Sequence, residues 1–424
     1  MPDHADLIIA GGGPVGAILA LALKDSGLSV MVLEARSDFT RKPDPRALAL
    51  SYGSMLMLRR LGIWQALPEP TPIETIHISQ QGSFGRAVLQ ASDDGLPALG
   101  YVVDYAALDL ALHQALADSG VHYVTGARVS RTRATGAYAV ADFECNGTEQ
   151  QATARLLALA DGGRSLGQMQ GVERCEHDYK QSAVVAQIKT EFPHRGIAFE
   201  RFTPDGPVAL LPSGADWALV WTLPPERAET VLSLSDDDFT AALHRHFGDR
   251  VGRILAAGKR ASFPLVLKYS RPVTAQRTVL LGNAAQMLHP VAGQGFNLGL
   301  RDAWELSEEI LAACKGHGKN AYTENEIRHA SSPHPNPNPL PEVEGANAKG
   351  ACFDLGDDAM LASYRARRRF DTRGSILFTD ALVRGFSNAD PLLRHARGIA
   401  LAALDGLPPL KRLVMRKMIY GVRG

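Results

Sequence analysis

The feature that most constrains the fold is the run GGGPVG, Gly11–Gly16, which directly follows a short apolar stretch. Residues 6–10 read as a buried strand, residues 15–26 as a helix rich in Ala and Leu, and residues 28–35 as a second strand. This order predicts one β-α-β unit, whose glycines permit a tight turn and close approach of a ligand to the backbone. A glycine motif by itself is weak evidence, because such turns are common.

Two later segments repeat the arrangement of an apolar strand followed by glycine and a polar residue. Residues 155–160, RLLALA, read as a strand that runs into Asp161-Gly162-Gly163. The apolar run that ends at Leu281 leads into LGNAAQMLHPVAGQGFNLGLRD, residues 281–302. Two nucleotide-type loops at opposite ends of one chain, each after an apolar strand, are much less common by chance than a single glycine motif.

Together these three segments resemble the class A flavoprotein monooxygenases, and the resemblance extends over most of the chain. It implies that the segments build one FAD site. The implied fold is α/β, with a Rossmann-like FAD-binding domain, a discontinuous antiparallel β-sheet substrate domain and a C-terminal helical segment. The form Gly-Asn-Ala-Ala-Gln-x-Leu-His-Pro-x-Ala-Gly-Gln-Gly is closest to the ubiquinone-biosynthesis hydroxylases, particularly the 2-octaprenyl-6-methoxyphenol hydroxylases. The stretch LGYVVD at 99–104 resembles a strand of the same branch.

A chain of 424 residues is too long for one ordinary core, so two domains are expected. Short alternating runs broken by Pro and Gly predict antiparallel strands in two separate stretches, so the chain leaves the nucleotide-binding layer twice and returns. We predict an FAD-binding domain over 1–71, 102–175 and 271–375, a substrate domain over 72–101 and 176–270, and a basic helical segment over 376–424.

Periodicity predicts further elements within this frame. Asp104 is placed to cap a helix in which Leu108, Leu112 and Leu116 recur every four residues. Other expected elements are a strand over 121–124 and helices over 46–61, 296–313 and 359–372.

A proline-rich insertion lies between the last two of these helices, within 315–358. Five of the 25 prolines fall between Pro333 and Pro341, so neither a helix nor a strand can continue through residues 331–349. We expect an exposed, disordered loop there, and a polyproline docking site is the alternative.

The resemblance assigns the cofactor's phosphates and ribose to the first β-α-β unit. Gly11, Gly13, Pro14 and Gly16 would hold the pyrophosphate at the positive end of the following helix. Glu34, about 20 residues further on, would accept hydrogen bonds from a ribose. A solvated carboxylate at the end of the strand is the alternative for Glu34.

The later segments are assigned to the flavin end of the cofactor. Asn283 would contact the ribityl chain, Pro290 would pack beside the isoalloxazine, and the turn Gly293–Gly295 would direct backbone N–H groups at its reduced, negatively charged part. Arg46 would lie close to the flavin, with an ordinary solvent-facing arginine as the alternative. The other implied cofactor-binding residues are Arg36, Val129, Asp161, Gly162, Gln294 and Asn297.

Two positions depart from the family pattern and put phosphate contacts there in doubt. Gln168 stands where the family usually has Arg. Asp109 stands where the family often has Arg or Gln. His289 and Pro290 are the candidates for catalytic positioning, and a structural histidine bonded to backbone is the alternative for His289.

The resemblance also implies the reaction. NAD(P)H, as a transient donor, reduces FAD, which reacts with O₂ to a C4a-hydroperoxide and transfers oxygen to the electron-rich ring of a polyprenylphenol. Membership of a ubiquinone-biosynthesis complex would be consistent with this role. The alternatives are a hydroxylase of a small soluble aromatic compound and a flavin-binding assembly subunit with little turnover.

Composition limits the partners and the compartment. Acidic and basic residues number 45 each, which gives no reason to expect nucleic acid. The four cysteines, Cys145, Cys175, Cys314 and Cys352, are far apart, so neither a metal site nor a disulfide framework is expected. The start of the chain has no basic leader and no apolar run is long enough for a transmembrane helix, which predicts a cytoplasmic protein.

The C-terminal segment predicts peripheral contact with the inner face of the cell membrane. Residues 394–424 contain seven basic residues against Asp405 alone, a net charge of +6. Leu410, Leu413, Val414 and Met418 lie at helical spacing beside these charges, which suits an anionic membrane surface. A helix packed on the body of the protein is the alternative.

Overall fold

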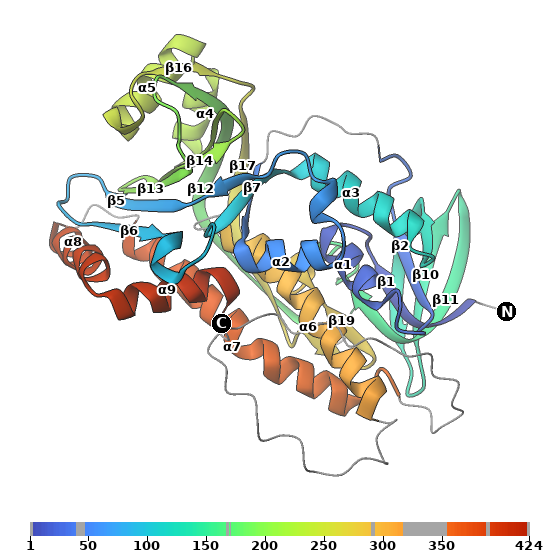
Figure 1. Ribbon diagram of the computed structural model, residues 1–424. Coiled ribbons are helices and arrows are strands. Elements are labelled where there is room, and N and C mark those ends of the chain that lie inside the picture. The colour runs from blue at the N-terminus through green and yellow to red at the C-terminus, as the bar shows by residue number, and fades with distance from the viewer. Residues whose placement is uncertain are drawn as a thin grey trace.

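The computed structural model describes residues 3–39, 47–166, 169, 171–289, 293–316, 354–386 and 391–421 (Figure 1). The predicted positions Arg46, Gln168 and Pro290, and the insertion at 331–349, lie outside the described residues. The fold class is the expected mixed α/β arrangement of two large sheets with helices around them.

The first sheet carries the parallel nucleotide-binding layer, with β1 at its centre between β2 and β11. β8 joins it beside β2, as predicted for residues 121–124, and β19 joins it beside β11. Its parallel strands are β1 (Asp3–Ala10), β2 (Val30–Glu34), β8 (His122–Thr125), β11 (Thr148–Leu159) and β19 (Thr278–Leu280). The antiparallel strands at its margins are β9 (Ala127–Ala134), β10 (Ala139–Cys145) and β18 (Thr274–Ala275).

Both faces of this sheet are covered, which explains why its central strands are continuous apolar runs. One face packs on three helices, and the other packs on the hairpin of β9 and β10. Asp104 caps α3 (Tyr105–Asp118), as predicted, because its Oδ1 accepts a hydrogen bond from the N–H of Ala107 at 2.8 Å. The helices are α1 (Pro14–Leu23), α3 (Tyr105–Asp118) and α6 (Gln294–Gly316).

The helix predicted over 46–61 is wrong at its start. Residues Ala47–Ser51 form β3, whose alternating Ala and Leu residues pair with β7 (Gly100–Asp104) in a small sheet that also holds β4 (Thr71–Ile73). Helix α2 (Tyr52–Arg60) begins only after Ser51, whose hydroxyl accepts a hydrogen bond from the N–H of Ser54. The cap therefore fixes the start of the helix.

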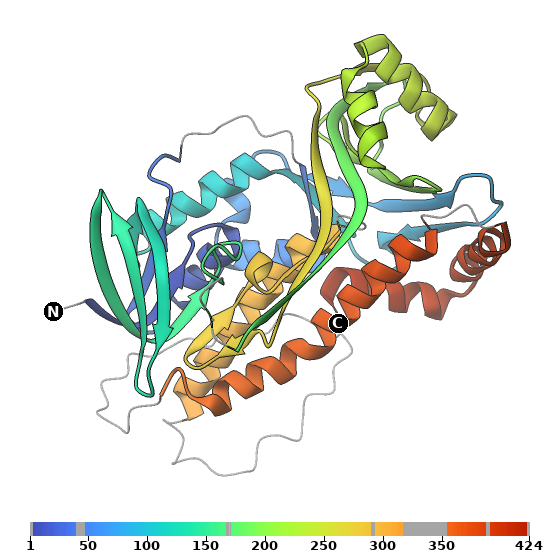
Figure 2. The ribbon, with the colours of Figure 1, turned by 180° about the vertical axis from the view of Figure 1, so that it is seen from behind.

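The second sheet is antiparallel apart from one parallel pair, β5 with β13. Its two long strands, β12 and β17, run side by side between the two parts of the molecule (Figure 2). Its strands are β5 (Thr75–Gln80), β6 (Arg86–Gln90), β12 (Glu173–Thr190), β13 (Ile197–Thr203), β14 (Gly206–Ser213), β15 (Asp216–Leu223), β16 (Ile254–Ala257), β17 (Ala261–Arg271) and β20 (Gln286–Met287).

Two helices that the sequence analysis did not predict cover the outer face of this sheet, at the top of Figure 1. They are α4 (Pro225–Ser233) and α5 (Asp236–Phe247). Phe239 and Phe247 of α5 pack with Trp217 and Trp221 of β15. Ser235, which caps α5 ahead of three acidic residues, was a readable signal for this helix.

Three helices complete the chain: α7 (Asp358–Phe386), α8 (Pro391–Gly406) and α9 (Pro408–Tyr420). α7 lies alongside α6 and continues without a break across the boundary expected at residue 375 (Figures 1 and 2). The residue-by-residue division into domains stays a prediction. In the described part of the chain, no helix combines the length and apolarity needed to cross a bilayer.

Candidate active site

The glycine-rich loop joins the carboxyl end of β1 to the first turn of α1. A Cβ atom on Gly11 would lie 2.7 Å from the carbonyl oxygen of Ala160, and one on Gly16 would lie 2.0 Å from that of Gly11. A Cβ on Gly13 would meet no atom within 4 Å, so this glycine faces open space. Gly13 is also the N-cap of α1 and has no side chain to cap it, which leaves the positive helix end available to an anion.

Glu34 is held rigidly at the end of β2, next to this loop. Its Oε2 accepts a hydrogen bond from the N–H of Gly12 at 2.8 Å, and its Oε1 accepts from the backbone N–H and Nε of Arg36. A carboxylate has about four acceptor sites, so Glu34 retains capacity for a further donor. The side chain is only 7% exposed, which argues against a merely solvated carboxylate.

Asp109 has an evident partner despite its departure from the family pattern. Its Oδ2 accepts a hydrogen bond from Nη1 of Arg36 at 2.7 Å, and its Oδ1 lies 3.5 Å from Nε2 of His113. Burial raises the pKa of Asp109, but His113 and Arg36 outweigh burial and hold that pKa below its ordinary value. The acid therefore anchors Arg36, which in turn holds Glu34.

The Asp-Gly segment follows β11 at the same edge of the sheet. Asp161 accepts hydrogen bonds from the N–H groups of Gly163 and Ser165, at 2.9 and 2.8 Å, and so closes its own turn. Gly162 adopts a φ of +76°, which favours glycine. A Cβ on Gly11 would lie 2.8 Å from the Cα of Asp161, so the two loops are in direct backbone contact.

Val129 belongs to β9, an antiparallel strand at the margin of the first sheet. It pairs with Phe143 across the β9–β10 hairpin and is half-buried against the apolar cluster on that face of the sheet. A cofactor contact through Val129 stays a prediction.

The 281–302 segment supplies the next wall of the site. Asn283 lies in a short 3₁₀ turn (Gly282–Ala284) directly after β19, with its side chain exposed. Gly293, at a φ of +61°, and Gly295 line a cavity together with Asn283. The predicted polar and glycine residues of this segment therefore border one space.

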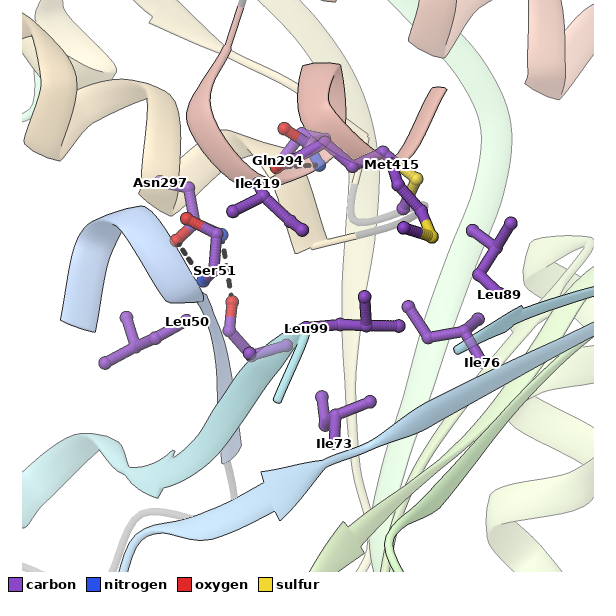
Figure 3. A pocket seen from close by; sticks show the side chains of 13 residues that line it. Leu50, Ser51, Ile73, Ile76, Leu89, Leu99, Gln294, Asn297, Met415 and Ile419 are labelled. Carbon is purple, nitrogen blue, oxygen red and sulfur yellow. Dashed lines mark hydrogen bonds between the residues drawn. The ribbon is translucent and has the colours of Figure 1, made fainter. Parts of the chain in front are cut away.

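Asn297 and Gln294 face away from that space, toward neighbouring backbone. The amide of Asn297 accepts a hydrogen bond from the N–H of Ser51 at 2.8 Å (Figure 3). It donates to the carbonyl oxygens of Ala49 and Gly293. Nε2 of Gln294 lies 3.5 Å from the carbonyl oxygen of Met418. The two amides fix β3 and α9 against the first turn of α6.

His289 is packed behind the loop. Its ring is 1% exposed and meets the ring of Tyr179 edge-on, with the centroids 5.3 Å apart. Burial lowers the pKa of His289 to about 4, so the imidazole is neutral at physiological pH. This placement favours the structural role over substrate contact.

A buried ion network beneath the loop was missed by the sequence analysis. Oδ2 of Asp302 accepts hydrogen bonds from the N–H of Gly282 and Nε2 of Gln286, while its Oδ1 pairs with Arg368 of α7 at 2.6 Å. Arg368 also pairs with Asp371 at 2.7 Å. Residues 367–369 are three consecutive arginines, and the sequence does not indicate which of them is buried.

The cavity itself lies between the second sheet, the 281–302 segment and the last three helices, and has a volume of about 460 Å³. Alternate strand residues, among them Ile78, Ala198, Ala209 and Val220, form one wall. The helices contribute Phe378 and Phe386 from α7, Leu404 from α8, and Val414 and Met418 from α9.

The C-terminal helix is thus part of the cavity wall, which corrects the prediction that Val414 and Met418 face a membrane. Met415 and Ile419 of α9 are also buried, in a smaller pocket of about 60 Å³ beside Leu89 and Leu99 (Figure 3). Two ion pairs hold the helix in place, Lys411 with Asp93 at 2.8 Å and Arg416 with Asp94 at 3.0 Å.

The sequence is similar to several known proteins. Residues 4–330 match the family model described as the FAD binding domain. The chain is 33% identical over 420 residues to ubiquinone hydroxylase UbiL of Rhodospirillum rubrum, covering 97% of this chain and 89% of that protein. It is 31% identical to 3-demethoxyubiquinol 3-hydroxylase of Escherichia coli, covering 97% of each. The chain belongs to the class A flavoprotein monooxygenases.

The fold of this flavoprotein agrees with solved structures of lower sequence identity. The p-nitrophenol 4-monooxygenase PnpA of Pseudomonas putida superposes with a TM-score of 0.73, at 18% identity and over 100% of both chains. The described residues fit FAD, since Gly13 leaves open space at a helix N-terminus and the exposed Asn283 borders the cavity.

Proposed function

We propose that this flavoprotein monooxygenase hydroxylates the aromatic ring of a polyprenylphenol in ubiquinone biosynthesis. Bound FAD, reduced by NAD(P)H, supplies activated oxygen from O₂. The loops around Gly13, Glu34 and Asp161 would hold its phosphates and ribose. Asn283 and the turn at Gly293–Gly295 would hold the flavin end.

The observation that carries this proposal is the apolar wall of the 460 Å³ cavity beside the 281–302 segment. A prenyl chain gains from leaving water for such a wall, at roughly 25 cal/mol per Å² of apolar surface. Independent support comes from two relatives that match over nearly the full chain and are named as a ubiquinone hydroxylase and a demethoxyubiquinol hydroxylase.

The same wall disfavours a small soluble aromatic acid as the substrate. Among the described residues that line the cavity there is no Lys or Arg to pair with a carboxylate, and the acid Glu200 would repel one. An aromatic acid would therefore be desolvated there without a counter-ion.

Removal of the gene from the source organism tests the pathway assignment. We expect the strain to accumulate a prenylphenol that lacks one ring hydroxyl and to lose ubiquinone. Reintroduction of the wild-type gene should restore ubiquinone. Normal ubiquinone in the deletion strain, with no accumulated precursor, would contradict the assignment.

We further propose that the outer face of α9 contacts an anionic membrane. Leu410 and Leu413 are 40% and 64% exposed, and Lys417 lies with them at i, i+3 and i+7 spacing on the exposed side of the helix. The cavity residues Val414 and Met418 lie on the inner side. A membrane-partitioned substrate would then have only this one helix between the bilayer and the cavity.

The corresponding prediction uses the triple variant Leu410→Ser, Leu413→Ser and Lys417→Glu. We expect its binding to vesicles of anionic lipid to fall at least tenfold, because it loses two apolar contacts and reverses a charge worth about 1 kcal/mol near the surface. FAD content should not change, since none of the three residues lines the cavity. Co-sedimentation with vesicles at low and high salt measures the effect.

Leu255→Ser is the matched control, because Leu255 is 50% exposed on β16, which lies at the top of Figure 1 and away from α9. Substitution of Lys411 or Arg416 would not serve, because both form the ion pairs that dock α9. Equal vesicle binding by the triple variant and the wild type would remove the proposed membrane face.

A further inference from the structure

One ionisable side chain lies among the apolar residues of the cavity. Ala198, Glu200 and Phe202 are alternate residues of β13 and line the same wall. The residues paired with Glu200 in the adjacent strands are Ile78 of β5 and Ala209 of β14, which line this wall too. Among the described residues that line the cavity, Glu200 is the only one that carries a charge.

None of the described residues that line the cavity provides a counter-ion for this carboxyl. The residues of α7, α8 and α9 that line the cavity are apolar, as are Ile78 and Ala209. Burial alone raises the pKa of Glu200 to about 7. Burial of an acid without a partner opposes folding, so its presence in this wall points to a ligand that supplies the missing hydrogen bond.

We propose that Glu200 accepts the hydroxyl hydrogen of the phenol ring bound in this cavity and takes up its proton during hydroxylation. The assignment rests on the proposed function. The phenol O–H bond breaks and a new O–H bond forms on the Glu200 carboxylate. The electron pair left on the phenol oxygen delocalises into the ring and makes its ortho and para carbons better nucleophiles toward the oxygen supplied by the flavin. The new ring C–O bond replaces a ring C–H bond, whose proton goes to the O₂ oxygen that leaves as water. Glu200 then returns its proton to the phenol oxygen.

Other polar groups near the cavity are less suited to this step. His289 is buried behind the loop, does not contribute to the described lining and has a pKa of about 4. Asn283 and Thr222 line the cavity but do not take up a proton near neutral pH. A general base works best when its pKa lies near the working pH, which Glu200 satisfies.

Glu200→Gln in the FAD-loaded enzyme tests the assignment, with 2-geranylphenol as the probe. Loss of a general base costs roughly 100-fold or more in rate, so we expect kcat to fall by that factor, beyond a rise in KM of about tenfold from the lost hydrogen bond to the phenol. Wild-type kcat/KM should rise with pH through about 7 and then level off, since only the carboxylate accepts the proton. This rise should be absent in the variant. FAD content should match the wild type.

Two comparisons separate this role from a structural one. Ring fluorination makes the phenol more acidic, so a fluorinated 2-geranylphenol should recover much of the loss in Glu200→Gln. Ile78→Val alters the same wall beside Glu200 but keeps the carboxyl, so it should retain the pH dependence.

Binding distinguishes failure of this assignment from failure of the proposed function. Titration of 2-geranylphenol, followed by flavin absorbance above pH 7, should show about tenfold weaker binding to Glu200→Gln whether or not turnover occurs, since a bond to a charged acceptor is worth about 1.5–3 kcal/mol. A wild type that binds the phenol but does not hydroxylate it would refute the proposed function alone. Equal binding, equal kcat and an unchanged pH profile in the variant would overturn the role of Glu200, as would a wild type that binds no phenol.

Discussion

Gly13→Asp should abolish FAD binding while leaving the fold intact. Gly13 has a φ of −63°, which any residue adopts, and its Cβ would meet no protein atom within 4 Å. The new carboxylate would instead occupy the space in which the pyrophosphate is expected. Two charges about 4 Å apart repel by roughly 4 kcal/mol at an effective dielectric constant near 20. We therefore expect the Kd for FAD to rise on the order of a thousand-fold.

Flavin absorbance of the purified protein and calorimetric titration with FAD measure this change. Gly136→Asp is the matched control, because a side chain at Gly136 also meets no atom within 4 Å and this glycine lies in the turn between β9 and β10. It should bind FAD like the wild type. Normal FAD content in Gly13→Asp would mean that the pyrophosphate does not approach this glycine.

Arg368→Met should be the most destabilising of the substitutions considered. Arg368 is 2% exposed and pairs with Asp302 and Asp371, which are 3% and 5% exposed. Its removal leaves Asp302 without a cation and Asp371 with Arg301 alone, which costs about 3–5 kcal/mol of unfolding free energy. Urea unfolding at neutral pH measures the loss. FAD content should fall with it, because Asp302 also holds the N–H of Gly282 beside Asn283.

Arg367→Met is the control for this prediction. Arg367 is 31% exposed, and its partners Glu308 and Glu309 lie nearer the surface, so its loss should cost less than about 1 kcal/mol. Equal stability of the two variants would contradict the account of the network.

The destabilisation should also depend on pH in a defined direction. Burial raises the pKa of Asp371, but Arg301 and Arg368 outweigh burial and hold that pKa below its ordinary value. The ion pairs of Asp371 therefore stabilise the folded wild type at pH values above the pKa that this carboxyl has in the unfolded chain. This stabilisation is lost as the pH falls through the lower pKa of the folded state. In Arg368→Met, Asp302 loses its cation and burial raises the pKa of this carboxyl, so it can protonate instead. The difference in unfolding free energy between wild type and variant should therefore narrow as the pH falls below neutral.

Local patterns predicted the nucleotide-binding half of the structure well. The strand, glycine loop and helix from Asp6 onward, and the helix capped by Asp104, each depend on signals within a few adjacent residues. The stretch that ends at Ser51 shows the limit of this approach. Its alternating Ala and Leu residues suit both a helix and a strand, and only the pairing of β3 with β7 makes it a strand.

The parts of the site that were missed depend on distant contacts. The stretch Phe199-Glu200-Arg201-Phe202 alternates without revealing which face is inward, and only the packing of α7 to α9 makes the face of Glu200 a cavity wall. Val414 was expected at a membrane for the same reason, since helical spacing identifies an apolar side without identifying what covers it.

Oxygen incorporation tests the central claim most directly. The purified FAD-loaded protein would be supplied with NAD(P)H and 2-geranylphenol under isotopically heavy O₂ in ordinary water, and the products would be analysed by mass spectrometry. The account predicts a phenol with one added ring hydroxyl whose oxygen comes from the gas. Donor oxidation that yields only hydrogen peroxide, or a product whose new oxygen comes from water, would contradict it.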